Sequence, residues 1–248
     1  MYNLYSSSDS SEGEEDASRG REITTLDLSN MTLDSTLLDH NLSIICDPEH
    51  NNAGKFKTML LYHNEIEFLS PKIAQFNNLK YIDISSNALH EFPPEICLCP
   101  LQTIIAKNNR FNNKSLPPTF SKLDKLRELN LSGNDFSHFP PEVLEMKSIK
   151  FLYLGGNKIS EIPKDIKKMQ NLQVLSMGGN LLSEVPVTLG QLKKLTALVL
   201  SDNRLQYLPR EIARLNHLKS LLLHKNQLRT LPTEIVALKC LTGVKFKG

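Results

Sequence analysis

The chain has 248 residues, an apolar content of 40% and a formal net charge of +2 at pH 7. The apolar content is enough for a core, and the near balance of charge gives no overall attraction to nucleic acid or to an anionic membrane. Aromatic residues make up 6% of the chain and tryptophan is absent, so a stacking platform for bases is not expected. Because no run of about 18 apolar residues occurs, we expect no segment that crosses a bilayer.

Residues 1–21 are rich in serine and in acidic side chains. They contain too few apolar side chains to offset the entropy cost of ordering, so we expect a disordered tail. Ser6 and Ser11 each precede a carboxylate by three positions (Asp9 and Glu14). Phosphorylation by an acid-directed kinase is therefore an alternative role for the tail. The tail has no basic region followed by an apolar run, so a secretory signal is not predicted.

Residues 22–55 are expected to form a degenerate first repeat that caps an array of repeats. Within this cap, residues 23–33 match the strand portion of the later repeats, with Met31 at the position that asparagine takes elsewhere. Residues 37–46 are apolar, and we expect them to pack as a short helix over the end of the core. Residues 47–55 have the composition of a surface loop.

Residues 56–240 contain eight repeats, and the last four, which begin at Ile149, are 23 residues long. Each carries L-x-x-L-x-L-x-x-N-x-L and then a proline segment, the period and pattern typical of leucine-rich repeats. Residues 111–118 lengthen one repeat by two, which predicts a small bulge, and residues 241–248 begin a truncated final repeat. The repeated asparagines are Asn64, Asn87, Asn109, Asn134, Asn157, Asn180, Asn203 and Asn226.

This pattern predicts an α/β fold, a leucine-rich repeat solenoid of horseshoe shape with a curved parallel sheet on its concave face. The two closely spaced leucines of each repeat point to one side of a short strand, and successive strands pair about 4.8 Å apart. The segment P-x-x-I-x-x-L supplies the crossover as a 3₁₀ or short α turn. The asparagines are expected to satisfy backbone groups where the chain leaves each strand.

The sequence contains no motif typical of catalysis or of metal or cofactor binding. No phosphate loop, zinc-protease motif or nucleophile elbow occurs, and Cys97 and Cys99 are too isolated for a zinc site. We therefore predict that the chain is not an enzyme and has no catalytic residues, metal, cofactor or small-molecule substrate. The four cysteines form no terminal cluster of the kind that disulfides build in secreted repeat proteins, which favours a reducing, cytoplasmic location.

The variable strand positions give the candidate site. An exposed sheet face is usually polar, yet these positions form an apolar patch over four consecutive repeats, and such patches tend to bind partners. The alternative is ordinary strand composition, because Val, Tyr and Phe favour sheets anyway. Neighbouring glycine pairs would let a partner approach the backbone. The predicted site consists of Phe151, Tyr153, Val174, Val199 and Leu222, with Lys219 and His224 on a basic rim.

The amino-acid sequences of the repeats resemble those of the leucine-rich repeat-containing protein 58 family of intracellular repeat proteins. The residues that carry this resemblance run from about Phe56 to the end, in the series AKNNRF, LNLSGNDF, LGGNKI, LVLSDNRL, LPREIARL and LLLHKNQL. The resemblance implies a non-enzymatic scaffold or adaptor for signal transduction that binds a protein partner. An alternative is a substrate-recognition subunit of a cullin-type ubiquitin ligase. The resemblance also implies a C-terminal segment with cysteines after the repeats, whereas this sequence stops at Gly248. A fragment, a short isoform or a truncated gene model would each account for this difference.

Overall fold

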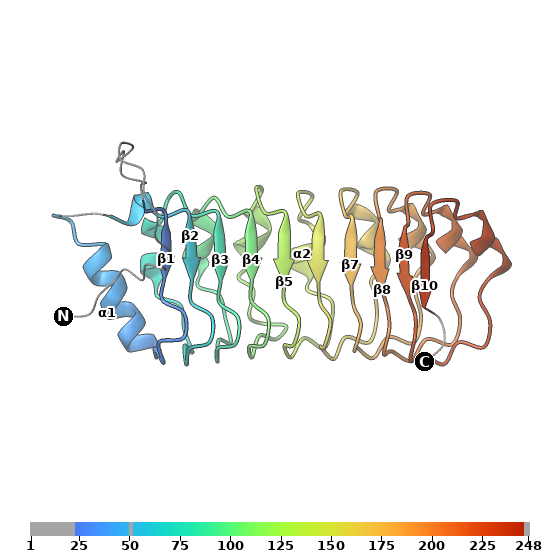
Figure 1. The fold of residues 1–248 in the computed structure, drawn as a ribbon, viewed down its shortest axis with the longest axis horizontal. Coiled ribbons are helices and arrows are strands. Elements are labelled where there is room, and N and C mark those ends of the chain that lie inside the picture. Colours follow the sequence, from blue (N-terminus) through green and yellow to red (C-terminus); the bar gives the residue numbers. More distant parts are fainter. Residues whose placement is uncertain (1–22, 50–51, 246–248) are drawn as a thin grey trace, which may run out of the picture.

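The computed structural model of the chain describes residues 23–49 and 52–245, so the predicted tail and its serines lie outside the described residues. Ten strands form one parallel sheet in which each strand pairs with the next one along the chain (Figure 1). The predicted α/β solenoid is confirmed, and the curvature of its sheet stays a prediction. The strands are β1 Thr25–Asp27, β2 Thr58–Leu60, β3 Tyr81–Asp83, β4 Thr103–Ile105, β5 Glu128–Asn130, β6 Phe151–Tyr153, β7 Val174–Ser176, β8 Ala197–Val199, β9 Ser220–Leu222 and β10 Gly243–Lys245.

Short helices return the chain from the end of one strand to the start of the next. A proline stands at the start of most of them, with φ of −69° at Pro186 and −61° at Pro232. Proline fixes φ in this range and has no N–H to leave unpaired at a helix start. The crossovers are α2 Pro141–Leu144 and the 3₁₀ helices Ala53–Lys55, Pro71–Gln75, Pro94–Leu98, Pro118–Lys122, Lys164–Lys168, Val187–Gln191, Arg210–Arg214 and Thr233–Ala237.

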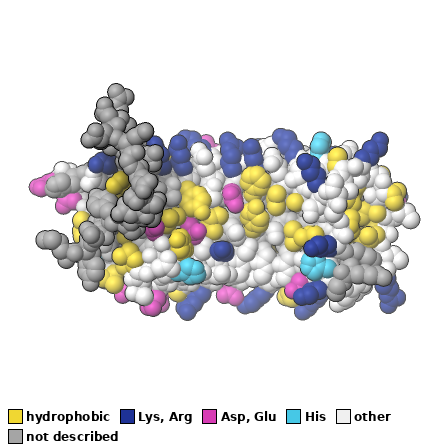
Figure 2. All heavy atoms as spheres, viewed as in Figure 1, with side chains coloured by type: hydrophobic (Ala, Val, Ile, Leu, Met, Phe, Trp, Pro, Cys, Tyr) yellow, Lys and Arg dark blue, Asp and Glu magenta, His cyan; other side chains and the backbone are white. Residues whose placement is uncertain are grey.

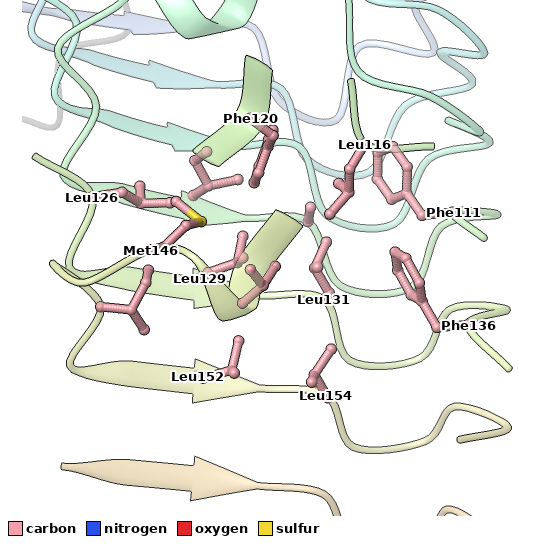
Figure 3. Packing of buried hydrophobic residues seen from close by; sticks show 14 of the residues in the cluster. Phe111, Leu116, Phe120, Leu126, Leu129, Leu131, Phe136, Met146, Leu152 and Leu154 are labelled. Atoms are coloured by element: carbon pink, nitrogen blue, oxygen red, sulfur yellow. The ribbon is translucent and has the colours of Figure 1, made fainter. Parts of the chain in front are cut away.

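The core fills the space between the strands and these helices. The middle residue of each of β2 to β9 is buried, and the side chain two residues further along points the same way, as Figure 3 shows for Leu129 with Leu131 and Leu152 with Leu154. Phe120 reaches this core from the helical side. Each repeat therefore shares its apolar layer with the repeats on either side.

Asparagine side chains link each repeat to the one before it. The Oδ1 of Asn180 accepts a hydrogen bond from the Ile159 N–H at 3.0 Å. Its Nδ2 donates to the carbonyls of Leu154 at 2.9 Å and Met177 at 3.0 Å. The amide thus pairs buried backbone groups of two repeats at once. The same arrangement recurs at Asn64, Asn87, Asn109, Asn134, Asn157, Asn203 and Asn226.

Replacing Asn180 by alanine is expected to lower the free energy of unfolding by about 1–3 kcal/mol, because buried backbone groups lose their partners. Urea unfolding followed by circular dichroism measures this. The control is Asn216→Ala, at an exposed position, where a change within about 0.5 kcal/mol is expected. Equal losses in the two variants would contradict a structural role for the ladder.

The first repeat lacks the asparagine, but its backbone N–H groups still donate hydrogen bonds to the asparagine of the next repeat. The N–H groups of Met31 and Leu33 both donate to Asn64 Oδ1 of the next repeat, each at 3.0 Å. Helix α1, Ser35–Ile45, follows and covers the end of the core with its buried residues Leu38 and Leu42 (Figure 1). The predicted covering helix is thus present.

A polar contact ties α1 to the second repeat. The Asp39 carboxylate lies 2.7 Å from Lys72 Nζ and accepts a hydrogen bond from the Ser70 hydroxyl at 2.5 Å. The hydrogen bond from Lys72, followed by that from Ser70, holds the pKa of Asp39 below its ordinary value. Folding therefore favours the ionised form of this carboxyl group.

We expect Asp39→Asn to lower stability by less than about 1 kcal/mol at neutral pH, since the ion pair is partly exposed. Because the folded pKa is depressed, the contribution is present above the unfolded value of about 3.9 and is lost as the pH falls through the folded value. The difference in melting temperature between wild type and Asp39→Asn should therefore shrink in acid. A difference that grew as the pH fell would contradict this account.

The two-residue insertion is absorbed on the side of the solenoid where the chain leaves the sheet. Ser115 is 2% exposed, and its hydroxyl accepts from the Asn112 N–H at 2.7 Å and donates to the His90 carbonyl. The Phe92 N–H donates to the Ser115 carbonyl at 2.9 Å. The strands on either side keep their register, so the predicted bulge leaves the sheet intact.

Candidate protein-binding surface

One face of the sheet is turned away from the core, and we call it the open face. It carries two rows of side chains. Each row takes one residue from every strand, on either side of the buried middle residue. The first row is Thr25, Thr58, Tyr81, Thr103, Glu128, Phe151, Val174, Ala197, Ser220 and Gly243. The second row is Asp27, Leu60, Asp83, Ile105, Asn130, Tyr153, Ser176, Val199, Leu222 and Lys245.

The five apolar residues of the predicted site share this face, on the neighbouring strands β6 to β9. Phe151 lies opposite Val174, and Val199 lies opposite Leu222. Tyr153 is separated from Val199 by Ser176 of β7. All five are half-buried, so they present apolar surface while belonging to the sheet. We call these five residues the apolar patch, and Figure 2 shows hydrophobic side chains over the middle of the sheet.

Polar residues border the apolar patch along the sheet. Glu128 and Asn130 of β5 lie opposite Phe151 and Tyr153. Burial, and then the negative charge of Glu128, raise the pKa of the Tyr153 phenol. The hydroxyl of Tyr153 therefore stays protonated near neutral pH and is available to donate a hydrogen bond.

The two predicted rim residues lie at opposite ends of β9. Lys219 directly precedes the strand and is exposed, whereas His224 follows it by two residues and is half-buried. The Nδ1 of His224 is buried and has no hydrogen-bond partner within the described part of the chain.

The glycine pairs beside the patch have a backbone explanation that the sequence did not reveal. Gly156 and Gly179 have φ of 64° and 66°, a left-handed conformation that glycine adopts without strain. A side chain at Gly155 would lie 3.1 Å from the Gly178 carbonyl oxygen. The turn after each strand therefore favours glycine at these positions without requiring it, since Asp202 and Lys225 hold the same turn position with φ of 56° and 54°. Close approach of a partner there stays a prediction.

A second surface feature was not predicted from the sequence. A hollow near the start of α1 is lined mostly by polar residues from the first four repeats, together with Phe68, which is 46% exposed. The Phe68 ring meets that of His90 edge-on, with centroids 4.3 Å apart. No repeat-wide sequence pattern marks this hollow, because α1 forms one of its sides.

Within residues 23–49 and 52–245, no group of three or more His, Cys, Asp or Glu side chains is arranged to hold a metal ion. The four cysteines are free thiols. Burial raises the pKa of the Cys99 thiol to about 12, which keeps that thiol protonated and unreactive. No helix in the described ranges has the length and apolar character needed to cross a bilayer.

Family models for leucine-rich repeats match this chain in three places. One model, described as leucine rich repeat, matches residues 147–205, and a second of the same description matches residues 78–99 and 125–146. Together with the parallel sheet and its asparagine ladder, these matches show that the chain contains leucine-rich repeats stacked as a solenoid.

Within this class, the chain is similar to leucine-rich repeat-containing protein 58 of Xenopus tropicalis, with 37% identity over 136 residues. The aligned part is 53% of this chain and 37% of the Xenopus protein, so the chain matches well under two thirds of that relative. The resemblance to leucine-rich repeat-containing protein 58 that the repeat sequences predicted is confirmed over this half of the chain.

Solved structures extend the likeness to nearly the whole fold. A leucine-rich repeat protein of Leptospira interrogans has a TM-score of 0.76 at 27% identity, and the alignment covers 91% of this chain and 61% of that one. The plant peptide hormone receptor RGFR1 in complex with RGF2 has a TM-score of 0.66 at 27% identity, covering 78% of this chain and 32% of that one. Leucine-rich repeat proteins generally act as protein-interaction modules, and nothing in the described site indicates catalysis.

Proposed function

We propose that this chain is a non-enzymatic interaction module that binds a protein partner through the apolar patch. The observation that supports the proposal is the placement of five half-buried apolar side chains on four adjacent strands of a face that is polar at β5. The ten strands at about 4.8 Å spacing span roughly 43 Å, enough for an interface of about 800 Å² per partner. A half-exposed sheet surface of this kind suits a protein better than a small molecule, which needs an enclosing pocket.

We further propose a scaffold or adaptor role in cytoplasmic signal transduction. The free thiols support a reducing compartment, and the open face alone is sufficient for an adaptor that binds one partner. The ligase-receptor alternative requires a second surface for the ligase, and no described feature specifically favours that role.

Affinity purification with mass spectrometry tests this proposal. Wild type and Tyr153→Glu are expressed as the full chain, and proteins recovered with wild type but lost with the variant are identified. Small GTPases or phosphatase subunits in that set would support the scaffold role, whereas cullin and adaptor peptides would favour the ligase receptor. An identical set from both variants would contradict binding at the apolar patch.

A further inference from the structure

The residues that directly precede the strands form a continuous row along one edge of the sheet. Backbone hydrogen bonds join successive members: the Lys150 N–H donates to the Arg127 carbonyl at 2.8 Å, and the Gln173 N–H donates to the Lys150 carbonyl at 2.8 Å. The row contains five basic and no acidic residues. Its members are Thr24, Lys57, Lys80, Gln102, Arg127, Lys150, Gln173, Thr196, Lys219 and Thr242.

Positive charge is concentrated along this whole edge of the sheet. The four residues that precede each of β2 to β10 include eleven lysines and arginines and one acidic residue, Asp124. The nine residues that follow each of β1 to β9 include seven basic and eight acidic residues. Figure 2 shows Lys and Arg side chains along the upper edge, where the strands begin in Figure 1. The two edges of the sheet therefore differ in charge.

Strands β5 and β6 are the two neighbouring strands that are each preceded by two basic side chains. Lys125 and Arg127 precede β5, and Lys147 and Lys150 precede β6; we call these four residues the basic cluster. None of them makes an ion pair of 4.0 Å or less with another described residue, whereas Lys158, beyond β6, lies 2.5 Å from Asp135. These four cations outnumber the two carboxylates next to them in the chain, Asp124 and Glu128, and make no described ion pair, so they form a surface that attracts an acidic segment.

This chain carries such a segment. Residues 1–22 include six acidic and two basic residues, and four of the acidic ones lie in the stretch Glu12–Asp16. The described chain begins at Ile23, just before β1 and at the same edge of the sheet. The segment Glu12–Asp16 is therefore opposite in charge to the basic cluster, and it is attached to the solenoid at the edge of the sheet where the basic cluster lies.

The distances also agree. Asp16 is seven residues from Ile23, a reach of about 23 Å when extended. Strands β5 and β6 lie four and five places from β1, or about 19–24 Å away. We propose that the segment Glu12–Asp16 docks on the basic cluster within the same molecule.

Attachment to the solenoid gives this segment an advantage over an acidic partner. A short covalent connection raises the local concentration of a tethered segment to about the millimolar range. A phosphate on Ser11 would add negative charge next to the docking segment and strengthen the contact. Because Lys150 directly precedes Phe151, the docked segment borders the apolar patch; its effect on access to the patch rests on the proposed function.

Carbodiimide crosslinking of the full chain tests the docking directly, because the reagent couples carboxylates to amines that are in contact. We expect crosslinks within one molecule from residues 12–16 to Lys125, Lys147 or Lys150. These should exceed crosslinks to Lys114 and Lys164, exposed lysines after β4 and β6, by about fivefold at low salt and converge with them near 1 M salt, where the screening length is about 3 Å. Replacing Arg127 by glutamine, which removes a charge of the basic cluster but no amine that the reagent couples, should lower the crosslinks to Lys125, Lys147 and Lys150, whereas Arg110→Gln, after β4, should leave them unchanged.

Mixing the protein with isotopically labelled protein separates contacts within one molecule from contacts between copies. Crosslinks that join light and heavy chains would overturn the proposal in favour of docking by a second copy. Equal crosslinking to the cluster lysines and the two control lysines would also overturn it, leaving the basic cluster for an acidic partner. No partner protein is needed, so failure of this test leaves binding at the apolar patch standing.

Discussion

Replacing Leu175 by alanine is expected to lower the free energy of unfolding by about 2–5 kcal/mol. Leu175 is 0% exposed at the centre of β7 and lies in register between Leu152 and Leu198. Truncation removes apolar contacts with both neighbouring repeats, and a one-dimensional array has few other contacts with which to compensate. The loss should be among the largest for any single truncation in the chain.

Urea unfolding followed by circular dichroism measures the effect of Leu175→Ala. The matched control is Val187→Ala, at a side chain that is 54% exposed on a crossover helix, where a change within about 0.5 kcal/mol is expected. A loss for Leu175→Ala no greater than that of the control would contradict the assignment of the strand leucines to the core.

Replacing Tyr153 by glutamate is expected to weaken partner binding by about 30-fold or more, the effect of losing about 2 kcal/mol at a central contact. The substitution removes the largest polar-tipped side chain of the apolar patch and places a carboxylate near Glu128. Like charges on a sheet face repel, and an apolar partner surface cannot pair them. Pull-down of a partner by wild type and by the variant measures the loss.

Stability separates a lost contact from a lost fold in this experiment. Tyr153 is half-buried and points away from the core, so the melting temperature of Tyr153→Glu should stay within a few degrees of wild type. Unchanged partner recovery by a folded variant would move the binding site to another face. Loss of recovery together with unfolding would call for the smaller substitution Tyr153→Ser.

The regular features of the fold were predictable because every repeat has the same core and hydrogen-bonding positions. Each asparagine pairs the same backbone groups, and the period of 23 residues puts successive strands in register without any special side chain. For the same reason the two rows of the open face follow from the spacing alone. The members of the apolar patch could be named from the sequence, although their role as a site stays a prediction.

Features made by one pair of side chains were not predictable. The contact of Asp39 with Ser70 and Lys72 depends on how α1 lies over the second repeat, and no repeat pattern sets that angle. Gly190 is another case, because a Cβ there would lie 2.2 Å from the Glu211 carbonyl oxygen in the next repeat. Only the packing of neighbouring crossover helices shows that this glycine is required.

The charge difference between the two edges of the sheet was also missed. The sequence shows a net charge of only +2, and the basic residues are scattered along the chain at intervals set by the repeat. The fold collects them on one edge because the same part of each repeat always returns there. The proposed docking of the segment Glu12–Asp16 depends on this collection.

The most direct test of binding at the apolar patch is a calorimetric titration of a purified partner against three forms of the full chain. Val199→Glu changes a half-buried valine of the patch, and Val187→Glu makes the same change at an exposed valine outside the open face. We predict the same dissociation constant for wild type and Val187→Glu, and one at least about 30-fold weaker for Val199→Glu. Equal affinities for the two variants, with both folded, would contradict the assignment of the partner site to the apolar patch.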